Sequence, residues 1–106
     1  MSLDIDLILD GAEVYSRNIT HNLGKMADAA GIYWCIWRPD EIGIKNAGQI
    51  IEPLAEGLEK LRSDPEKYQE FNPSNMWGSY TGLVEFVEEY LEACKSSPDA
   101  KIIVCR

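Results

Sequence analysis

The chain is poor in the residue types that most often indicate a function. Its 106 residues include one histidine, and ten basic residues are outnumbered by 18 acidic ones, which gives a formal net charge of −8. A nucleic-acid-binding protein normally concentrates lysine and arginine to displace counterions from phosphates, so we expect no nucleic-acid partner. No apolar run approaches the roughly 18–20 residues of a membrane span, and we expect no membrane partner.

Cysteine is also scarce, and this limits metal and disulfide chemistry. Cys35, Cys94 and Cys105 are an odd number without close spacing, which is not the pattern of a disulfide framework. A chain with no Cys-x-x-Cys pair and a single histidine is a poor candidate for structural zinc, and we expect neither a metal nor a cofactor. Met1–Asp6 lacks the basic segment of a signal peptide, and reduced thiols are usual in the cytoplasm, which is the location we predict.

The amino-acid composition is that of a globular protein. Hydrophobic residues make up 45% of it and charged residues 26%, close to the average of folded domains, so we expect residues 1–106 to form a single domain. The glycines are too far apart for the glycine-rich loops that cradle phosphates.

Two segments have the pattern of strands. Residues 4–19 read as a β-hairpin, because an apolar run and the strand-favouring pair Val14 and Tyr15 flank the turn-forming pair Asp10-Gly11. Residues 101–105 are rich in β-branched side chains and predict a terminal strand. Since an isolated hairpin is marginal in water, we expect one small antiparallel sheet of about three strands.

The remaining segments predict helices. Residues 23–30 follow a helical period, with Thr20 or Asn22 as the cap, and 32–37 favour a short helix over a buried strand. Pro53 predicts a kink or a late start in the amphipathic stretch 46–62. A short helix should run from Asp64 to about Phe71, and a last one should begin at Ser79 or Thr81. The expected fold class is α+β, with several helices packed against the sheet.

Three polar and aromatic stretches, 18–22, 37–39 and 71–80, contain the candidate ligand-binding residues. Asparagine offers both a donor and an acceptor, tryptophan a flat face and arginine a forked cation, so together they could hold a small polar or aromatic ligand. The same residue types also cap helices and anchor loops, and this structural interpretation is favoured; Trp77 should then be at least half buried. The candidates are Asn18, His21, Asn22, Trp37, Arg38, Asn72, Asn75, Trp77 and Tyr80.

His21 is the one candidate catalytic residue. It lies where a helix is expected to begin, and the positive end of the helix dipole disfavours the charged imidazole. We therefore interpret it as a neutral, hydrogen-bonding helix cap. The alternative is a general acid or base, which would require an orienting carboxylate and a substrate.

Four sequence strings resemble a family of small acidic proteins of phage, prophage and bacterial genomes. They are Asn18–Leu23, Ala30–Tyr33, Trp37–Pro39 and Asn72–Tyr80, so the resemblance spans nearly the whole chain. The family usually has a glycine where this chain has Met76, and an aliphatic residue followed by alanine where it has Trp34 and Cys35. The resemblance implies a phage or prophage origin and no particular activity.

These observations predict a small intracellular binding or interaction protein. Its partner would be another protein or a small polar ligand, and self-association is left open. The alternative is a small enzyme that acts on a metabolite or nucleotide, with His21 as its acid–base group. The enzyme should place a carboxylate within hydrogen-bond reach of His21, whereas the binding protein should present an open patch or a symmetric interface there.

Overall fold

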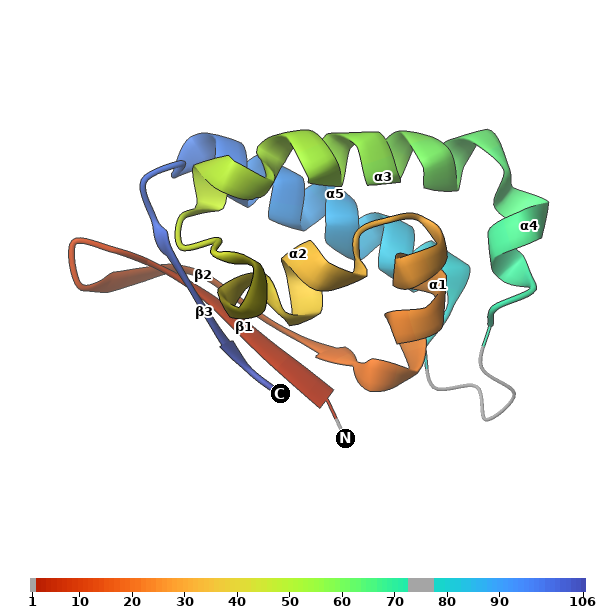
Figure 1. The fold of residues 1–106 in the computed structure, drawn as a ribbon, viewed down its shortest axis with the longest axis horizontal. Coiled ribbons are helices and arrows are strands. Elements are labelled where there is room, and N and C mark those ends of the chain that lie inside the picture. The colour runs from red at the N-terminus through yellow and green to blue at the C-terminus, as the bar shows by residue number, and fades with distance from the viewer. Residues whose placement is uncertain (1, 73–77) are drawn as a thin grey trace.

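One antiparallel sheet underlies the fold in the computed structural model, which describes residues 2–72 and 78–106. β1 (Ser2–Leu9) is the middle strand, with β2 (Ala12–Thr20) on one side and β3 (Lys101–Cys105) on the other (Figure 1). Asp10 and Gly11 form the hairpin turn, and both have the positive φ that a tight two-residue turn requires. The predicted hairpin and terminal strand are confirmed.

The predicted helices are also present, and the described residues form a short 3-10 helix that was not predicted, Pro39–Ile42. In chain order, with η for 3-10 helices, they are η1 (His21–Leu23), α1 (Gly24–Ala29), α2 (Tyr33–Trp37), η2 (Pro39–Ile42), η3 (Ala47–Ile50), α3 (Ile51–Ser63), α4 (Pro65–Gln69) and α5 (Tyr80–Ser96). Pro53 is the third residue of α3, in the first turn, where its missing N–H costs no helical hydrogen bond. Within the part of the chain described, no helix is both long and apolar enough to cross a membrane.

The structure decides between the predicted alternatives for two helix caps: Thr20 rather than Asn22, and Ser79 rather than Thr81. The Thr20 side chain accepts a hydrogen bond from the backbone N–H of Asn22, and that of Ser79 accepts one from Gly82. Asp64 does the same for the first turn of α4, with Pro65 directly after it. Each cap satisfies a backbone N–H that a helix leaves unpaired at its start.

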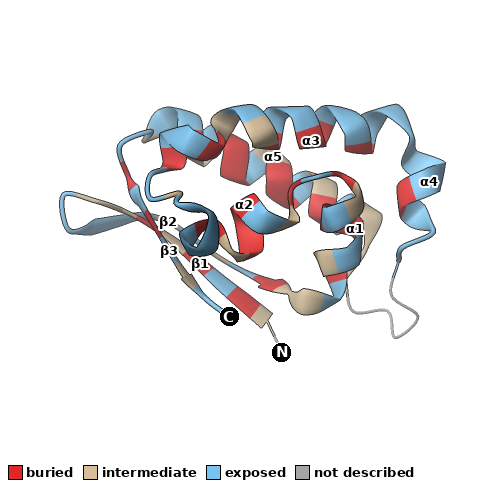
Figure 2. Cartoon of the chain, in the orientation of Figure 1, coloured by how far each residue is buried: buried red, intermediate tan, exposed pale blue. Residues whose placement is uncertain are grey.

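All the helices lie on one side of the sheet, and the core fills the space between (Figure 1). Leu3, Ile5 and Leu7 of β1 are fully buried, while the alternate residues Asp4 and Asp6 face away from the helices. Buried positions likewise follow the inner faces of α3 and α5 (Figure 2). This layer arrangement is a small α+β domain, as the sequence predicts.

The short helix α2 is held inside this core by α3. Ile32, which precedes α2, is fully buried, and its side chain lies against Gly57 of α3. A Cβ atom on Gly57 would collide with Cγ2 of Ile32, so a glycine is needed for α3 to approach this closely. The position of α2 therefore depends on a residue 25 positions later in the chain.

Two of the three cysteines are core residues, as expected. Cys35 of α2 and Cys94 of α5 are buried, and burial raises the pKa of each thiol to about 12. The Cys35 thiol donates to the carbonyl of Ile32, 3.3 Å away. Cys105 of β3 is exposed.

Two adjacent isoleucines of β3 provide a test of the strand alternation. Ile102 is 9% exposed and packs into the core, whereas Ile103 is 44% exposed on the opposite face. Ile102→Ala should lower the free energy of unfolding by about 2–4 kcal/mol, because it removes buried methyl groups and leaves a cavity. Ile103→Ala, the matched control, should cost less than about 1 kcal/mol. Chemical denaturation measures both, and equal losses would contradict the assigned faces.

Candidate functional site

A hydrogen bond between His21 and Trp37 defines the candidate site. Trp37 is 2% exposed, and its indole Nε1 donates to Nδ1 of His21 over 2.9 Å. Because Nδ1 accepts, the proton of the neutral imidazole is on Nε2. His21 begins η1 at the end of β2, so this bond ties α2 to the start of the helical layer. The prediction that His21 caps the helix is wrong: the capping residue is Thr20, and the ring of His21 pairs with a side chain instead.

Aromatic side chains of α2 form one wall beside this bond. The ring of Tyr33 stacks on that of Trp37, with centroids 5.4 Å apart and an angle of 10° between the planes. Trp34 stands nearly perpendicular to Tyr33, at 5.8 Å and 89°, and is 48% exposed. The buried Trp37 thus supports Tyr33, while Trp34 leaves much of its surface open to a ligand.

The aromatic wall faces a polar wall across a hollow of about 410 Å³. The polar wall comes from η1 and α1, where His21, Lys25 and Asp28 share one helix face with Gly24. The Tyr33 ring lies 3.4 Å from the position of a Cβ on Gly24, so the two helices meet closely at the base of the hollow. This combination of a flat apolar surface and a few polar groups is typical of small-ligand sites.

A second hollow of about 360 Å³ adjoins the first one. It is lined by His21, Tyr33, Trp37, Arg38 and Arg106, so His21 and Tyr33 belong to both hollows. Its distinguishing feature is the presence of two guanidinium groups, one from the end of α2 and one from just beyond β3.

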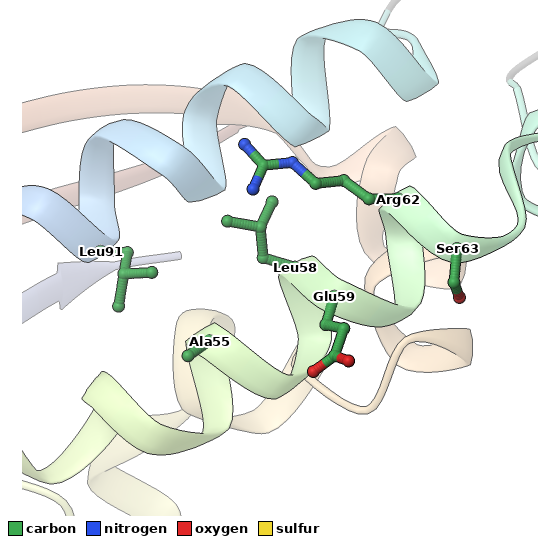
Figure 3. Close-up of a pocket in the computed structure, with 6 residues that line it drawn as sticks. All are labelled: Ala55, Leu58, Glu59, Arg62, Ser63 and Leu91. Atoms are coloured by element: carbon green, nitrogen blue, oxygen red, sulfur yellow. The ribbon is translucent and has the colours of Figure 1, made fainter.

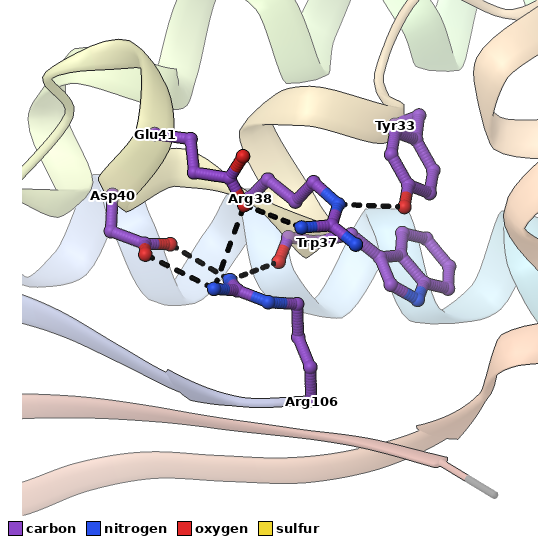
Figure 4. A network of polar contacts seen from close by, with 6 residues as sticks. All are labelled: Tyr33, Trp37, Arg38, Asp40, Glu41 and Arg106. Atoms are coloured by element: carbon purple, nitrogen blue, oxygen red, sulfur yellow. Dashed lines mark hydrogen bonds and ion pairs between the residues drawn. The ribbon is translucent and has the colours of Figure 1, made fainter.

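A polar network holds these two arginines in place (Figure 4). Arg38 donates from Nε to the hydroxyl of Tyr33 over 3.1 Å and pairs with Glu41. Arg106 donates to the backbone carbonyl of Trp37 over 3.0 Å and to both carboxylate oxygens of Asp40. The hydrogen bonds from Arg106 hold the pKa of the Asp40 carboxyl below its usual value, so Asp40 is charged at neutral pH.

Two predicted site residues near His21 do not join the hollows. Asn18 lies on the sheet face that the helices leave uncovered, where its amide donates to Ser2 and Asp4. The exposed Asn22 lines neither hollow. Asn18 therefore stabilises the pairing of β1 with β2, at a place separate from the aromatic wall.

The described residues of the predicted stretch 71–80 lie outside both hollows. A Cβ on Gly78 would lie 2.8 Å from a side-chain carbon of Thr20 and 3.0 Å from Leu23, so Gly78 itself packs against the end of β2 and against η1. Asn72 accepts a hydrogen bond from the backbone N–H of Tyr80, and the Tyr80 hydroxyl donates to the carbonyl of Leu61. These contacts anchor Asn72 and Tyr80. The predicted site residues Asn75 and Trp77 lie outside the described residues, as does the expected burial of Trp77.

Sequence reasoning missed several lining residues, among them Lys25, Asp28, Tyr33, Trp34 and Arg106. The spacing of residues 21, 24, 25 and 28 is that of one helix face and could have indicated the polar wall. No local pattern indicates Arg106, because it reaches Asp40 across 66 positions of sequence.

A separate hollow of about 460 Å³ lies between α3 and α5 (Figure 3). Its walls are mainly the apolar side chains of Ala55, Leu58 and Leu91, and the Arg62 side chain extends toward α5 to pair with Glu88. None of the predicted site residues lines it.

Neither a metal-binding cluster nor a similar known protein indicates what the site binds. Across residues 2–72 and 78–106, no three His, Cys, Asp or Glu side chains are grouped so that they could hold a metal ion. Comparison of the chain with protein-family models, curated proteins and solved structures gives no significant match. The resemblance drawn from the sequence strings stays a prediction.

The packing of Gly78 on η1 can be tested with a matched pair of glycines. Gly78 and Gly43 both have positive φ, but a Cβ on Gly43 would meet nothing within 4 Å. Gly43→Ala should cost about 1–2 kcal/mol of stability from backbone strain alone. Gly78→Ala should cost about 1–3 kcal/mol more, because its methyl group also overlaps Thr20 and Leu23. Thermal or chemical unfolding gives both values, and equal costs would argue against this contact.

The bond between His21 and Trp37 predicts a second stability effect. His21→Ala leaves the buried indole N–H without its acceptor and should lower the free energy of unfolding by about 1–3 kcal/mol. His21→Gln should cost less, because its amide oxygen can accept the same hydrogen bond. Asn22→Ala, an exposed neighbour, should change stability by less than about 0.5 kcal/mol. A double-mutant cycle with Trp37→Phe measures the coupling, and a coupling near zero would mean that the bond contributes nothing.

Proposed function

We propose that this chain is a small binding protein whose site is the hollow between α1 and α2. The observation that carries the proposal is the hydrogen bond from Trp37 to Nδ1 of His21. It orients the imidazole and makes Nε2–H a donor, at the place where an exposed tryptophan offers a flat face. A ligand that fits these groups has a flat or apolar part and a hydrogen-bond acceptor on its edge.

The fixed wall supports binding because the site needs little ordering when a ligand arrives. Tyr33 is supported on one side by the buried Trp37, and its hydroxyl accepts from Arg38, so its own proton is left to donate. Binding then costs little side-chain entropy at these positions. A cytoplasmic location and a phage or prophage origin stay part of this proposal.

The tautomer of His21 favours binding over the alternative of acid–base catalysis. In a general base of the usual kind, Nδ1–H donates to an orienting acceptor, and the lone pair of Nε2 takes the proton from the substrate. Here the orienting partner is a donor, so Nε2 carries the proton and its lone pair is not available. This arrangement makes His21 a hydrogen-bond donor to a ligand.

An NMR titration with flat probe molecules tests the proposal. We expect indole, benzoate and adenosine to shift the backbone signals of His21, Lys25, Tyr33 and Trp34, with at least one of them saturating. Trp34→Ala should weaken the binding of that probe by about three- to tenfold, because stacking contributes roughly 0.5–1.5 kcal/mol.

Phe71→Ala is the matched control, since Phe71 is also a partly exposed aromatic residue but lines neither hollow. It should leave the affinity unchanged. The proposal fails if no probe perturbs the four signals, or if both variants weaken binding equally.

A further inference from the structure

The two adjoining hollows differ in chemistry, and together they define a ligand with two parts. The first presents the exposed face of Trp34 and a row of polar groups, and the second presents the guanidinium groups of Arg38 and Arg106. His21 and Tyr33 line both, so one molecule can extend from the first hollow into the second. We infer that the ligand is a free mononucleotide, with its base on Trp34 and its phosphate at the arginines; this inference rests on the proposed binding function.

The polar wall of the first hollow suits a heteroaromatic base better than a hydrocarbon ring. His21 offers an N–H donor and Lys25 a cation, whereas the Asp28 carboxylate only accepts. A nucleobase carries acceptors and N–H donors side by side on its edge and so can satisfy both kinds of group. A plain aromatic ring would leave them without partners, which costs affinity.

The second hollow offers the type of donor that binds phosphate. A guanidinium group binds phosphate oxygens through paired N–H donors, and Arg38 and Arg106 converge on the same carboxylate, Glu41 (Figure 4). Their present partners Asp40 and Glu41 have exposed side chains. Exposed ion pairs contribute little to stability, so a phosphate can take the place of Glu41 at small cost.

The overall charge favours a free nucleotide over a nucleic-acid strand. The chain has a formal net charge of −8, which repels an extended phosphate backbone. A single phosphate is affected mainly by the charges close to the two hollows. These charges sum to about zero, because Lys25, Arg38 and Arg106 match Asp28, Asp40 and Glu41 in number. No glycine-rich loop is required, because the contacts come from side chains.

Calorimetric titration of the full chain with six probes tests this inference. The probes are adenosine and guanosine, the matching 5′-monophosphates, inorganic phosphate, and a short single-stranded DNA. At least one monophosphate should bind about tenfold or more tightly than its nucleoside, the gain expected from hydrogen bonds between charged groups. Inorganic phosphate and the single strand should both bind more weakly than that monophosphate.

Variants separate the two parts of the ligand. Arg38→Gln should reduce the affinity for the monophosphate to that for the nucleoside, and Trp34→Ala should weaken both. Glu41→Gln should strengthen monophosphate binding several-fold, because it removes the carboxylate that competes with phosphate. Glu56→Gln, an exposed position on α3, makes the same change in net charge and should not alter the affinity.

The outcomes distinguish this inference from the function it rests on. If nucleosides bind at Trp34 but the phosphate adds no affinity, the proposed binding site is supported and the assignment of the ligand as a mononucleotide is wrong. Tighter binding of the single strand than of the monophosphate would also overturn it, as would equal effects of Glu41→Gln and Glu56→Gln. If no flat probe binds at all, the proposed function fails as well.

Discussion

The buried indole of Trp37 sets the main constraint on this structure. Its ring fills the core between the sheet and the helices, and its single polar atom must find an acceptor there because an unpaired buried N–H is costly. His21 provides that acceptor from the end of β2. The first turn of the helical layer and the short helix α2 are thereby joined at one point, and the hollow between them is a consequence of this packing.

The same short helix serves the core and the surface because its residues point in different directions. Cys35, Ile36 and Trp37 are buried, while Tyr33 and Trp34 face the hollow and Arg38 follows at its end. Gly57 lets α3 press on Ile32 and so fixes where α2 begins. Packing against the core orders the aromatic wall before a ligand binds. Binding to an ordered site loses less conformational entropy.

Electrostatics around the site differ from those of the whole chain. The net charge of −8 comes from acids spread along the strands, helices and loops of the chain, whereas the basic side chains near His21 are matched by neighbouring carboxylates. The ion pairs of Arg38 and Arg106 are exposed, so they orient the guanidinium groups more than they stabilise the fold. An acidic protein can in this way keep a local region that tolerates an anion.

The sequence by itself determined the local structure. The Asp10-Gly11 turn, the caps Thr20, Ser79 and Asp64, and the apolar stripes of the helices depend on residues a few positions apart, and all of them were predictable. Only the tertiary structure decided that Trp37 meets His21, that Tyr33 and Trp34 face Lys25 and Asp28, and that Arg106 reaches Asp40. Such contacts join residues far apart in sequence, and no local pattern encodes them, because they arise when whole helices pack against the sheet.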